Sequence, residues 1–197
     1  MVNITKVYTK QGDQGQTSLA GGQRLSKDSP RMQSIGYLDE LNAYLGWCLM
    51  SLSQTENNTQ EYHIAQMLLA IQHQLFDAGA QLAVLPEDQR ENTPRILKRD
   101  IDQLEASIDQ LNEQLPKLTS FILPGGGEAS CRFHITRSVC RHLERSLVTL
   151  KHSEPEIDEL ILSYINRLSD WLFVTARAIA SSQGYQETLW QSQLRDV

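Results

Sequence analysis

The chain of 197 residues, 40% hydrophobic and 21% charged, is long enough to bury one hydrophobic core. No Gly/Ser/Pro-rich linker divides it, so we expect a single domain over residues 1–197. The formal net charge of −6 disfavours a nucleic-acid partner, because such binding rests on a cationic surface. A membrane partner is not expected either, since no stretch approaches the roughly 18 apolar residues that a spanning helix needs.

Three cysteines, Cys48, Cys131 and Cys140, show neither Cys-x-x-Cys spacing nor an even count. This pattern predicts neither a structural zinc site nor a disulfide framework. The first residues contain no apolar run of signal-peptide length. We therefore expect reduced thiols in a cytoplasmic protein.

Residues 1–30 combine glycines with hydroxyl side chains and lysines, and only Val7, Tyr8 and Thr9 suggest a short extended piece. We expect an irregular segment. Between Thr9 and Ser18, glycines allow backbone N–H groups to turn toward an anion, while Thr, Ser and Lys side chains offer further donors. The spacing is not that of a Walker A loop. A phosphate-binding loop and a plain Gly-Asp turn both fit these residues.

Beyond residue 30, apolar residues recur at helical spacing in five separate stretches. The first two stretches step by threes and fours, and Pro86 follows the second where that helix should end. Their apolar positions are Ile35, Leu38, Leu41, Leu45, Cys48 and Leu52 in the first, and Ile64, Leu68, Ile71, Leu75, Ala78, Leu82 and Leu85 in the second.

The third stretch is predicted to begin with Thr93 as a cap and Pro94 at the first helical position, and to end at Pro116. The fourth runs over about residues 128–150, and the fifth begins after Pro155. The apolar positions of the fourth are Cys131, Ile135, Val139, Leu143, Leu147 and Leu150; those of the fifth are Ile157, Ile161, Tyr164, Leu168, Leu172 and Ile179.

Five amphipathic helices joined by short polar connections predict an all-α fold, a five-helix antiparallel bundle over residues 31–182. Short connections leave consecutive helices adjacent, so each apolar face can be buried against a neighbour. The irregular glycine-rich segment precedes this bundle, and residues 183–197 form a C-terminal tail.

Arg137, Arg141 and Arg145 form a stripe on the fourth stretch, on the side away from its apolar positions. Like charges one turn apart oppose helix formation by roughly 0.2–0.5 kcal/mol per pair, which suggests a compensating anion. Glu144 lies beside the stripe and could neutralise part of it. A solvated basic face with local ion pairs is the competing interpretation.

Phe121 opens the segment FILPGGG, which turns from an apolar run into the fourth helix. Its backbone N–H groups lie at a helix N-terminus, where anions are favoured, although a flexible connector fits the same residues. On the fifth stretch, Asn166 and Asp170 are one turn apart among apolar residues, which indicates hydrogen bonding inside the bundle or solvation at its surface. His134 is interpreted as a packed or capping histidine rather than a ligand.

From Lys6 to about Ala180, the chain resembles the PduO-type ATP:cob(I)alamin adenosyltransferases. The segments that carry the resemblance stand in the order TKQGDQGQTSL, KDSPR, DELNAYLG, FILPGG, HITRSVCRHLER and INRLSDWLF. The resemblance implies transfer of the 5′-deoxyadenosyl group of ATP to cobalt(I) of cobalamin or cob(I)yrinic acid a,c-diamide. Inorganic triphosphate would be released, in the formation of adenosylcobalamin.

The resemblance also implies a set of residues that bind ATP. The N-terminal loop would wrap the triphosphate through Thr9, Lys10, Gln11, Gly12, Thr17, Ser18 and Lys27. Arg141, Glu144 and Arg145 would close on the same ligand, and Asn166 would hold the nucleoside. Mg²⁺ is expected on the phosphates without a dedicated cage of protein ligands, as is usual for this ion.

The family resemblance further implies a homotrimer with active sites between subunits, where Asp39 and Arg137 pair across the boundary. Phe121 would lie beneath the corrin and exclude an axial ligand from cobalt, which eases reduction of cobalt(II) by a reductase. Cobalt(I) attacks the 5′ carbon in line, so no general base is needed. Catalysis then rests on alignment and on stabilising the leaving triphosphate, with Phe121, Arg137 and Arg141 as the catalytic residues.

Two positions depart from the family pattern. His142 stands where a second consecutive arginine is common, which weakens one contact or makes it sensitive to pH. The sequence also stops at Val197, where some relatives carry a further aromatic that helps cover the corrin, and Trp190 is a candidate to substitute for it. A di-iron bundle is excluded because no Glu-x-x-His pair occurs. A non-catalytic helical module that senses ATP stays open, because binding residues alone do not establish turnover.

Overall fold

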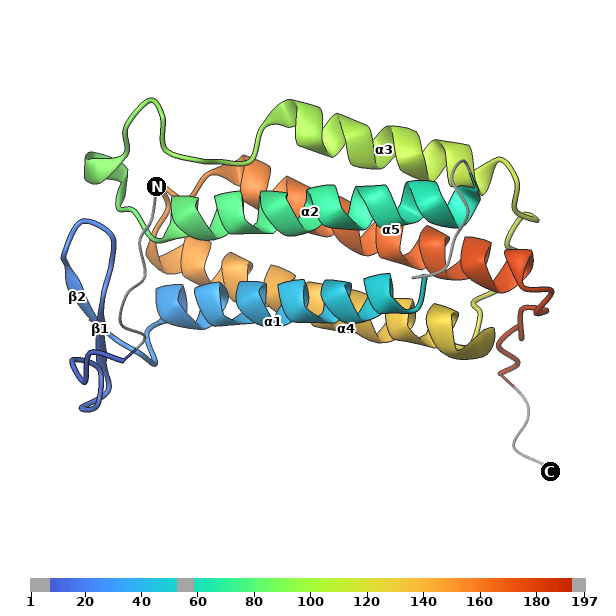
Figure 1. The fold of residues 1–197 in the computed structure, drawn as a ribbon, viewed down its shortest axis with the longest axis horizontal. Coiled ribbons are helices and arrows are strands. Elements are labelled where there is room, and N and C mark those ends of the chain that lie inside the picture. Colours follow the sequence, from blue (N-terminus) through green and yellow to red (C-terminus); the bar gives the residue numbers. More distant parts are fainter. Residues whose placement is uncertain (1–7, 53–58, 193–197) are drawn as a thin grey trace.

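The computed structural model describes residues 8–52 and 59–192, and within them five long helices form an antiparallel bundle (Figure 1). The helices are α1 Pro30–Met50, α2 Gln60–Leu82, α3 Lys98–Asn112, α4 Gly127–Ser153 and α5 Glu159–Ser182. Successive helices run in opposite directions; α1 packs on α2 and α4, and α5 packs on α4 and α3. The all-α prediction is confirmed.

The core of the bundle is built from the predicted apolar stripes together with large aromatic side chains. Trp171 and Tyr164 of α5 and Phe133 of α4 are completely buried. The polar atoms of the first two are satisfied, because Trp171 Nε1 donates to Ser107 Oγ (2.9 Å) and Tyr164 Oη donates to Gln74 Oε1 (2.7 Å). No helix in the described ranges is long and apolar enough to cross a bilayer.

The third helix begins at Lys98, so the prediction of a Thr93 cap with Pro94 as the first helical residue is wrong. Thr93 Oγ1 instead accepts from Arg90 N (2.9 Å) within the preceding turn. The buried Ile96 N–H donates to the Gln81 side chain of α2 (3.2 Å), a long-range contact that keeps this segment out of the helix.

Two predicted helix ends also lie beyond the observed ones. α2 ends at Leu82 rather than at Pro86, and Leu85 is extended, as a residue before proline prefers. A short 3-10 helix, η1 Pro86–Asp88, follows. α3 ends at Asn112, before Pro116.

The apolar face of α4 was assigned partly to the wrong positions. Ile135 is 44% exposed, whereas Thr136 is completely buried and donates to Arg132 O (2.8 Å). The face toward the core consists of Phe133, Thr136, Cys140, Leu143, Leu147 and Leu150. Because a threonine occupies this core position, the pattern of apolar residues indicated the neighbouring Ile135 instead. Cys48, Cys131 and Cys140 are free thiols.

The N-terminal segment contains a small hairpin that the sequence did not indicate. Strand β1 Gln16–Ser18 pairs antiparallel with β2 Arg24–Ser26, with Thr17 opposite Leu25. Tyr8 and Thr9 belong to no strand, and Val7 lies outside the described residues. The hairpin lies beyond one end of the bundle (Figure 1), where Ala20 N donates to Ala83 O (2.9 Å) after α2.

Candidate functional site

The glycine-rich loop that precedes β1 folds back on the end of β2. Gly15 N donates to Gly12 O (3.2 Å), and Lys27 N donates to Gly15 O (2.8 Å). The Lys27 ammonium lies against Gly12: a Cβ placed on Gly12 would be 2.9 Å from Lys27 Nζ and 3.3 Å from Gln16 O. The absence of a side chain at Gly12 therefore makes room for this cation.

The predicted donors of this loop share one exposed end of the molecule. Thr9, Lys10, Gln11, Ser18 and Lys27 are exposed, whereas Gly12 and Thr17 are half-buried. Lys10 has φ +61°, the only positive φ of a non-glycine residue in the described chain. Such a conformation costs free energy and occurs more often at functional sites than elsewhere.

A second group of predicted residues meets on the face shared by α4 and α5. Arg141 Nη1 lies 3.9 Å from Glu144 Oε2, and Glu144 Oε1 accepts a hydrogen bond of 2.8 Å from Asn166 Nδ2. Arg145 is exposed and forms no ion pair with any described residue. Asn166 is exposed as well, so the interpretation that placed it inside the bundle is wrong.

Arg137 lies one turn from Arg141, with its guanidinium over the ring of Phe173 at 5.3 Å from the ring centre. Burial, and then the charge of Arg141, lower the pKa of Arg137. A cation in this position gains electrostatic stabilisation from any anion that binds nearby.

His134 is a packed histidine, as the sequence indicated. It is buried, lies edge-on to Phe173 at 6.2 Å between ring centres, and its Nδ1 has no hydrogen-bond partner among the described residues. Burial, and then the charge of Arg137, lower its pKa. The ring is therefore neutral near pH 7.

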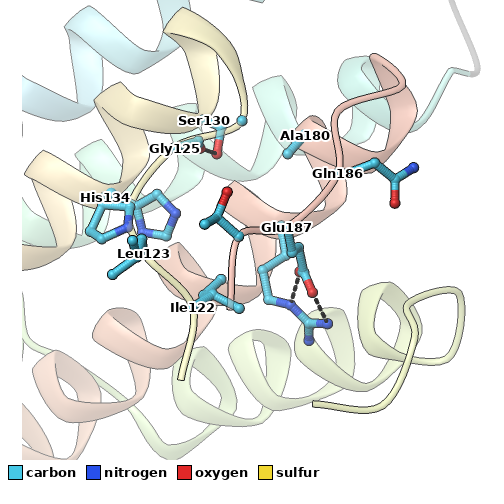
Figure 2. A pocket seen from close by; sticks show the side chains of 12 residues that line it. Ile122, Leu123, Gly125, Ser130, His134, Ala180, Gln186 and Glu187 are labelled. Atoms are coloured by element: carbon cyan, nitrogen blue, oxygen red, sulfur yellow. Dashed lines mark hydrogen bonds and ion pairs between the residues drawn. The ribbon is translucent and has the colours of Figure 1, made fainter. Parts of the chain in front are cut away.

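Phe121 belongs to the connection from α3 to α4, which lies at the end of the bundle opposite the hairpin (Figure 1), and the residue is 80% exposed. Trp190 packs edge-on against it at 6.4 Å between ring centres. Behind the loop that follows Phe121 is a cavity of about 230 Å³, lined in part by His134, Ser130 and Glu187 (Figure 2). The exposed aromatic pair is suited to the face of a large flat ligand.

Within the described part of the structure, a single chain does not bring all the predicted site residues together in one place. The glycine-rich loop lies with the hairpin beyond one end of the bundle, the Arg141 cluster lies on α4 and α5, and Phe121 belongs to the connection from α3 to α4 at the opposite end (Figure 1). Asp39 lines a groove between α1 and α2, whereas Arg137 lies on the α4–α5 side. His142, one of the two departures, stacks on Tyr37 of α1 with ring centres 4.1 Å apart.

Sequence reasoning missed Phe173 and Arg177, which extend the same face of α5. A signal for them existed in the spacing Asn166, Asp170, Phe173, Arg177, which steps by four, three and four and so defines one helical stripe. Trp190 was named without a position, and the structure places it beside Phe121.

Known proteins share this architecture. The family model for cobalamin adenosyltransferase matches residues 7–179. The chain is 43% identical over 182 residues to the corrinoid adenosyltransferase of Bacillus subtilis (strain 168), a match that covers 91% of this chain and 89% of the relative. It is 42% identical over 172 residues to the corrinoid adenosyltransferase PduO of Salmonella typhimurium, which covers 87% of this chain and 49% of that protein.

A solved structure is equally similar in fold. It is a variant of the PduO-type ATP:corrinoid adenosyltransferase from Lactobacillus reuteri complexed with cobalamin and ATP. The TM-score is 0.85 at 35% sequence identity, over 94% of this chain and 99% of that one. The chain therefore belongs to the cobalamin adenosyltransferase family, a family of transferases.

Proposed function

We propose that this chain transfers the 5′-deoxyadenosyl group of ATP to cobalt(I) of a corrinoid and releases inorganic triphosphate. The observation that carries the proposal is the cluster of Arg141, Glu144 and Asn166 on the α4–α5 face, one turn from Arg137. The similar Lactobacillus reuteri structure is a complex with cobalamin and ATP. Likeness over almost the whole chain supports the same two substrates here.

ATP suits the chemistry of this cluster. The 3.9 Å contact between Arg141 and Glu144 is long, which leaves guanidinium donors available to a phosphate. Arg145 adds an exposed cation, and the amide of Asn166, oriented by Glu144, can hydrogen-bond the nucleoside. Residues 1–30 supply the remaining donors, led by Lys10 and Lys27.

Mg²⁺ enters with the phosphates in this proposal. No group of three His, Cys, Asp or Glu side chains within residues 8–52 and 59–192 could hold a metal ion. Magnesium commonly binds through substrate phosphates and water instead of a cage of protein ligands. Its chemistry there is to neutralise charge on the leaving triphosphate.

The reaction asks the protein for alignment and charge stabilisation. A lone pair of cobalt(I) forms the bond to the 5′ carbon while the bond from that carbon to oxygen breaks, and the oxygen leaves with both electrons. No proton moves, so no general base is required. Arg137 and Arg141 would stabilise the developing charge, and partial burial of Arg137 strengthens its effect.

The active site is proposed to lie between subunits of a homotrimer. Asp39 and Arg137 lie on different sides of the bundle, so they can pair only between chains, in a head-to-tail contact. Asp39 lines a largely apolar groove of about 490 Å³ beside Phe76, which is 71% exposed. A second copy would cover this apolar surface, and head-to-tail contacts that close form a ring.

The assembly is tested by Asp39→Ala. If Asp39 pairs with Arg137 of a neighbour, its loss leaves a partly buried arginine without a partner, which typically costs about 3–5 kcal/mol when fully buried. Sedimentation should show a weakened trimer and activity should fall with it. Glu40→Ala, next in sequence and also exposed, is the matched control. An active monomer, or full activity of the Asp39→Ala trimer, would contradict the intersubunit site.

Phe121 is proposed to lie beneath the corrin, where its exposed ring would keep axial ligands away from cobalt. Removing an axial donor lowers the energy of the orbital that accepts the electron, so cobalt(II) becomes easier to reduce. A separate reductase would supply that electron. The cytoplasmic location expected from the sequence stays a prediction.

The decisive experiment mixes the protein anaerobically with ATP and chemically reduced cobalamin and follows formation of the alkylcobalt by its absorbance. Product should form together with stoichiometric triphosphate. A module that only senses ATP would bind nucleotide without forming product, and that result would overturn the proposal. Repeating the assay with cob(I)yrinic acid a,c-diamide identifies the preferred corrinoid.

A further inference from the structure

The end of the chain runs alongside the Phe121 segment. Residues 186–190, called here the C-terminal strap, form one antiparallel bridge with it, in which Ile122 lies opposite Leu189. Leu123 N donates to Thr188 O (2.8 Å), and Trp190 N donates to Phe121 O (2.7 Å). Ser120 Oγ also donates to Trp190 O (3.2 Å). The backbone of Phe121 is therefore fixed by the strap.

The strap is in turn fixed to the bundle by a buried ion pair. Arg177 of α5 is 3% exposed, and its Nε and Nη2 donate to the two carboxylate oxygens of Glu187 at 2.5 and 3.3 Å. Arg177 Nη2 also donates to Pro116 O (2.8 Å). Figure 2 shows the Glu187 carboxylate, with its two contacts to the guanidinium dashed. A planar guanidinium bound at two oxygens sets orientation as well as distance.

Phe121 has little else to hold it. Its side chain is 80% exposed, and within the described chain Trp190 of the strap is the ring that packs against it. The loop after it is anchored further along the chain, where Gly125 O accepts from Ser130 Oγ (2.7 Å). The position of the Phe121 ring therefore depends on contacts made by the strap.

We propose that Arg177 and Glu187 are positioning residues that hold the C-terminal strap against the Phe121 segment and so fix the Phe121 ring for reduction of cobalt(II). This inference rests on the proposed function. A ring that excludes an axial ligand must stay packed against the face of the corrin, because a gap large enough for a water molecule would let an axial donor reach cobalt. The electron comes from an external one-electron donor such as a reduced flavin, and the ion pair takes no part in the transfer to carbon.

The test compares Glu187→Ala with wild type in two assays, one started from cobalt(II) with reduced flavin and one from chemically prepared cobalt(I). Turnover from cobalt(II) should fall on the order of tenfold, since small misplacements of a positioned group have effects of this size or larger. Turnover from cobalt(I) and the KM for ATP should change less than about twofold. The electron paramagnetic resonance spectrum of bound cobalt(II) should shift from four- toward five-coordinate.

Three further variants keep the result interpretable. Glu159→Ala removes the glutamate of the exposed Lys151 pair at the other end of α5, and should leave both assays unchanged. Trp190→Pro removes the N–H that binds Phe121 O, whereas Trp190→Ala keeps it, so the cobalt(II) assay should fall further with proline than with alanine. This pair decides the matter if Glu187→Ala does not fold.

Equal losses from both cobalt states, in step with a lower melting temperature, would show that the ion pair is merely structural and would overturn the inference. Unchanged turnover from cobalt(II) would overturn it as well. Failure of the proposed function gives a different result, because wild type itself would then form no alkylcobalt from cobalt(I).

Discussion

A buried arginine lies at each end of the bundle, and the two arginines make the same kinds of contact. At the hairpin end, Arg31 is 2% exposed, donates to Leu82 O (2.5 Å) and pairs with the Glu154 carboxylate. At the Phe121 end, Arg177 is 3% exposed, donates to Pro116 O and pairs with the Glu187 carboxylate. Each guanidinium thus satisfies its donors with one carbonyl and one carboxylate.

The partners differ in where they lie. Leu82 is the last residue of α2 and Glu154 caps α4, so Arg31 ties three helices of the frame together. Pro116 and Glu187 lie after the ends of α3 and α5, so Arg177 ties a helix to segments outside the bundle. One type of contact can therefore serve the stability of the frame at one end and the orientation of a surface segment at the other.

The largest expected effect is on the frame. Arg31→Met leaves the Glu154 carboxylate and the Leu82 carbonyl without their donor, so the free energy of unfolding should fall by about 3–5 kcal/mol. Denaturant unfolding measures it. Arg99→Met, an exposed arginine of α3, should leave the midpoint unchanged. A loss for Arg31→Met as small as that of Arg99→Met would break the distinction between the two ends.

The next effect concerns the face between the ends. Arg141→Ala should weaken ATP binding at least tenfold, because a charged hydrogen-bonded contact contributes roughly 1.5–3 kcal/mol. Its side chain is 47% exposed, so the melting temperature should hold. Calorimetric titration with ATP, with Arg99→Ala as control, measures the change. Equal affinities of the two variants would remove Arg141 from the nucleotide site.

A smaller effect is expected at the hairpin end. In Gly12→Ala the new Cβ would crowd Lys27 Nζ, which can swing aside at little cost to the fold. The displaced cation should weaken ATP binding by about two- to fivefold, equivalent to roughly 0.4–1 kcal/mol. Gly46→Ala, within α1, is the matched control, since its Cβ would meet only Gln72 Nε2 at 3.4 Å. Wild-type affinity for ATP in Gly12→Ala would mean that ATP binding does not depend on the position of Lys27 beside Gly12.

The last expected effect is a pH dependence of stability at the Phe121 end. Burial lowers the pKa of His134 in the folded state below its unfolded value of about 6.5. The folded protein thus binds fewer protons, and this contribution to stability is present above pH 6.5 and is lost as the pH falls through the folded pKa. Wild type should lose up to about 1.4 kcal/mol per pH unit more than His134→Gln over that window. If the free energies of unfolding of the two proteins changed with pH in parallel, a lowered pKa of His134 in the folded state would be contradicted.

The sequence predicted those parts of the fold that depend on local pattern. The stripe from Ile64 to Leu82 on α2 is buried as expected, because steps of three and four reflect only the geometry of the helix. The predicted start of α3 was wrong because the observed start depends on Gln81, a side chain from another helix. The predicted buried face of α4 was partly wrong because Thr136 is buried, with its hydroxyl hydrogen-bonded to the backbone.

Some residues of the candidate site could likewise be identified from the sequence, whereas others are revealed only by the tertiary fold. The resemblance selected Arg141, Glu144 and Asn166, and the structure brings these three together on one face. The position of Phe173 under Arg137 depends on how α4 packs on α5, which no single stripe specifies. The contact of Trp190 with Phe121 joins segments distant in sequence, so only the tertiary fold discloses it.

Gly126 and Gly127 have a consequence for how variants of this loop should be interpreted. At φ +87° and +89°, an added Cβ would lie 2.5 Å from Ala180 Cβ at Gly126 and 2.6 Å from Tyr185 Cε2 at Gly127. A saturation mutagenesis screen would therefore reject nearly every substitution at both positions, as it would at a residue that contacts substrate. The cause at these two sites is close approach of α4 to the end of α5, so intolerance of substitution in this loop does not by itself identify a ligand contact.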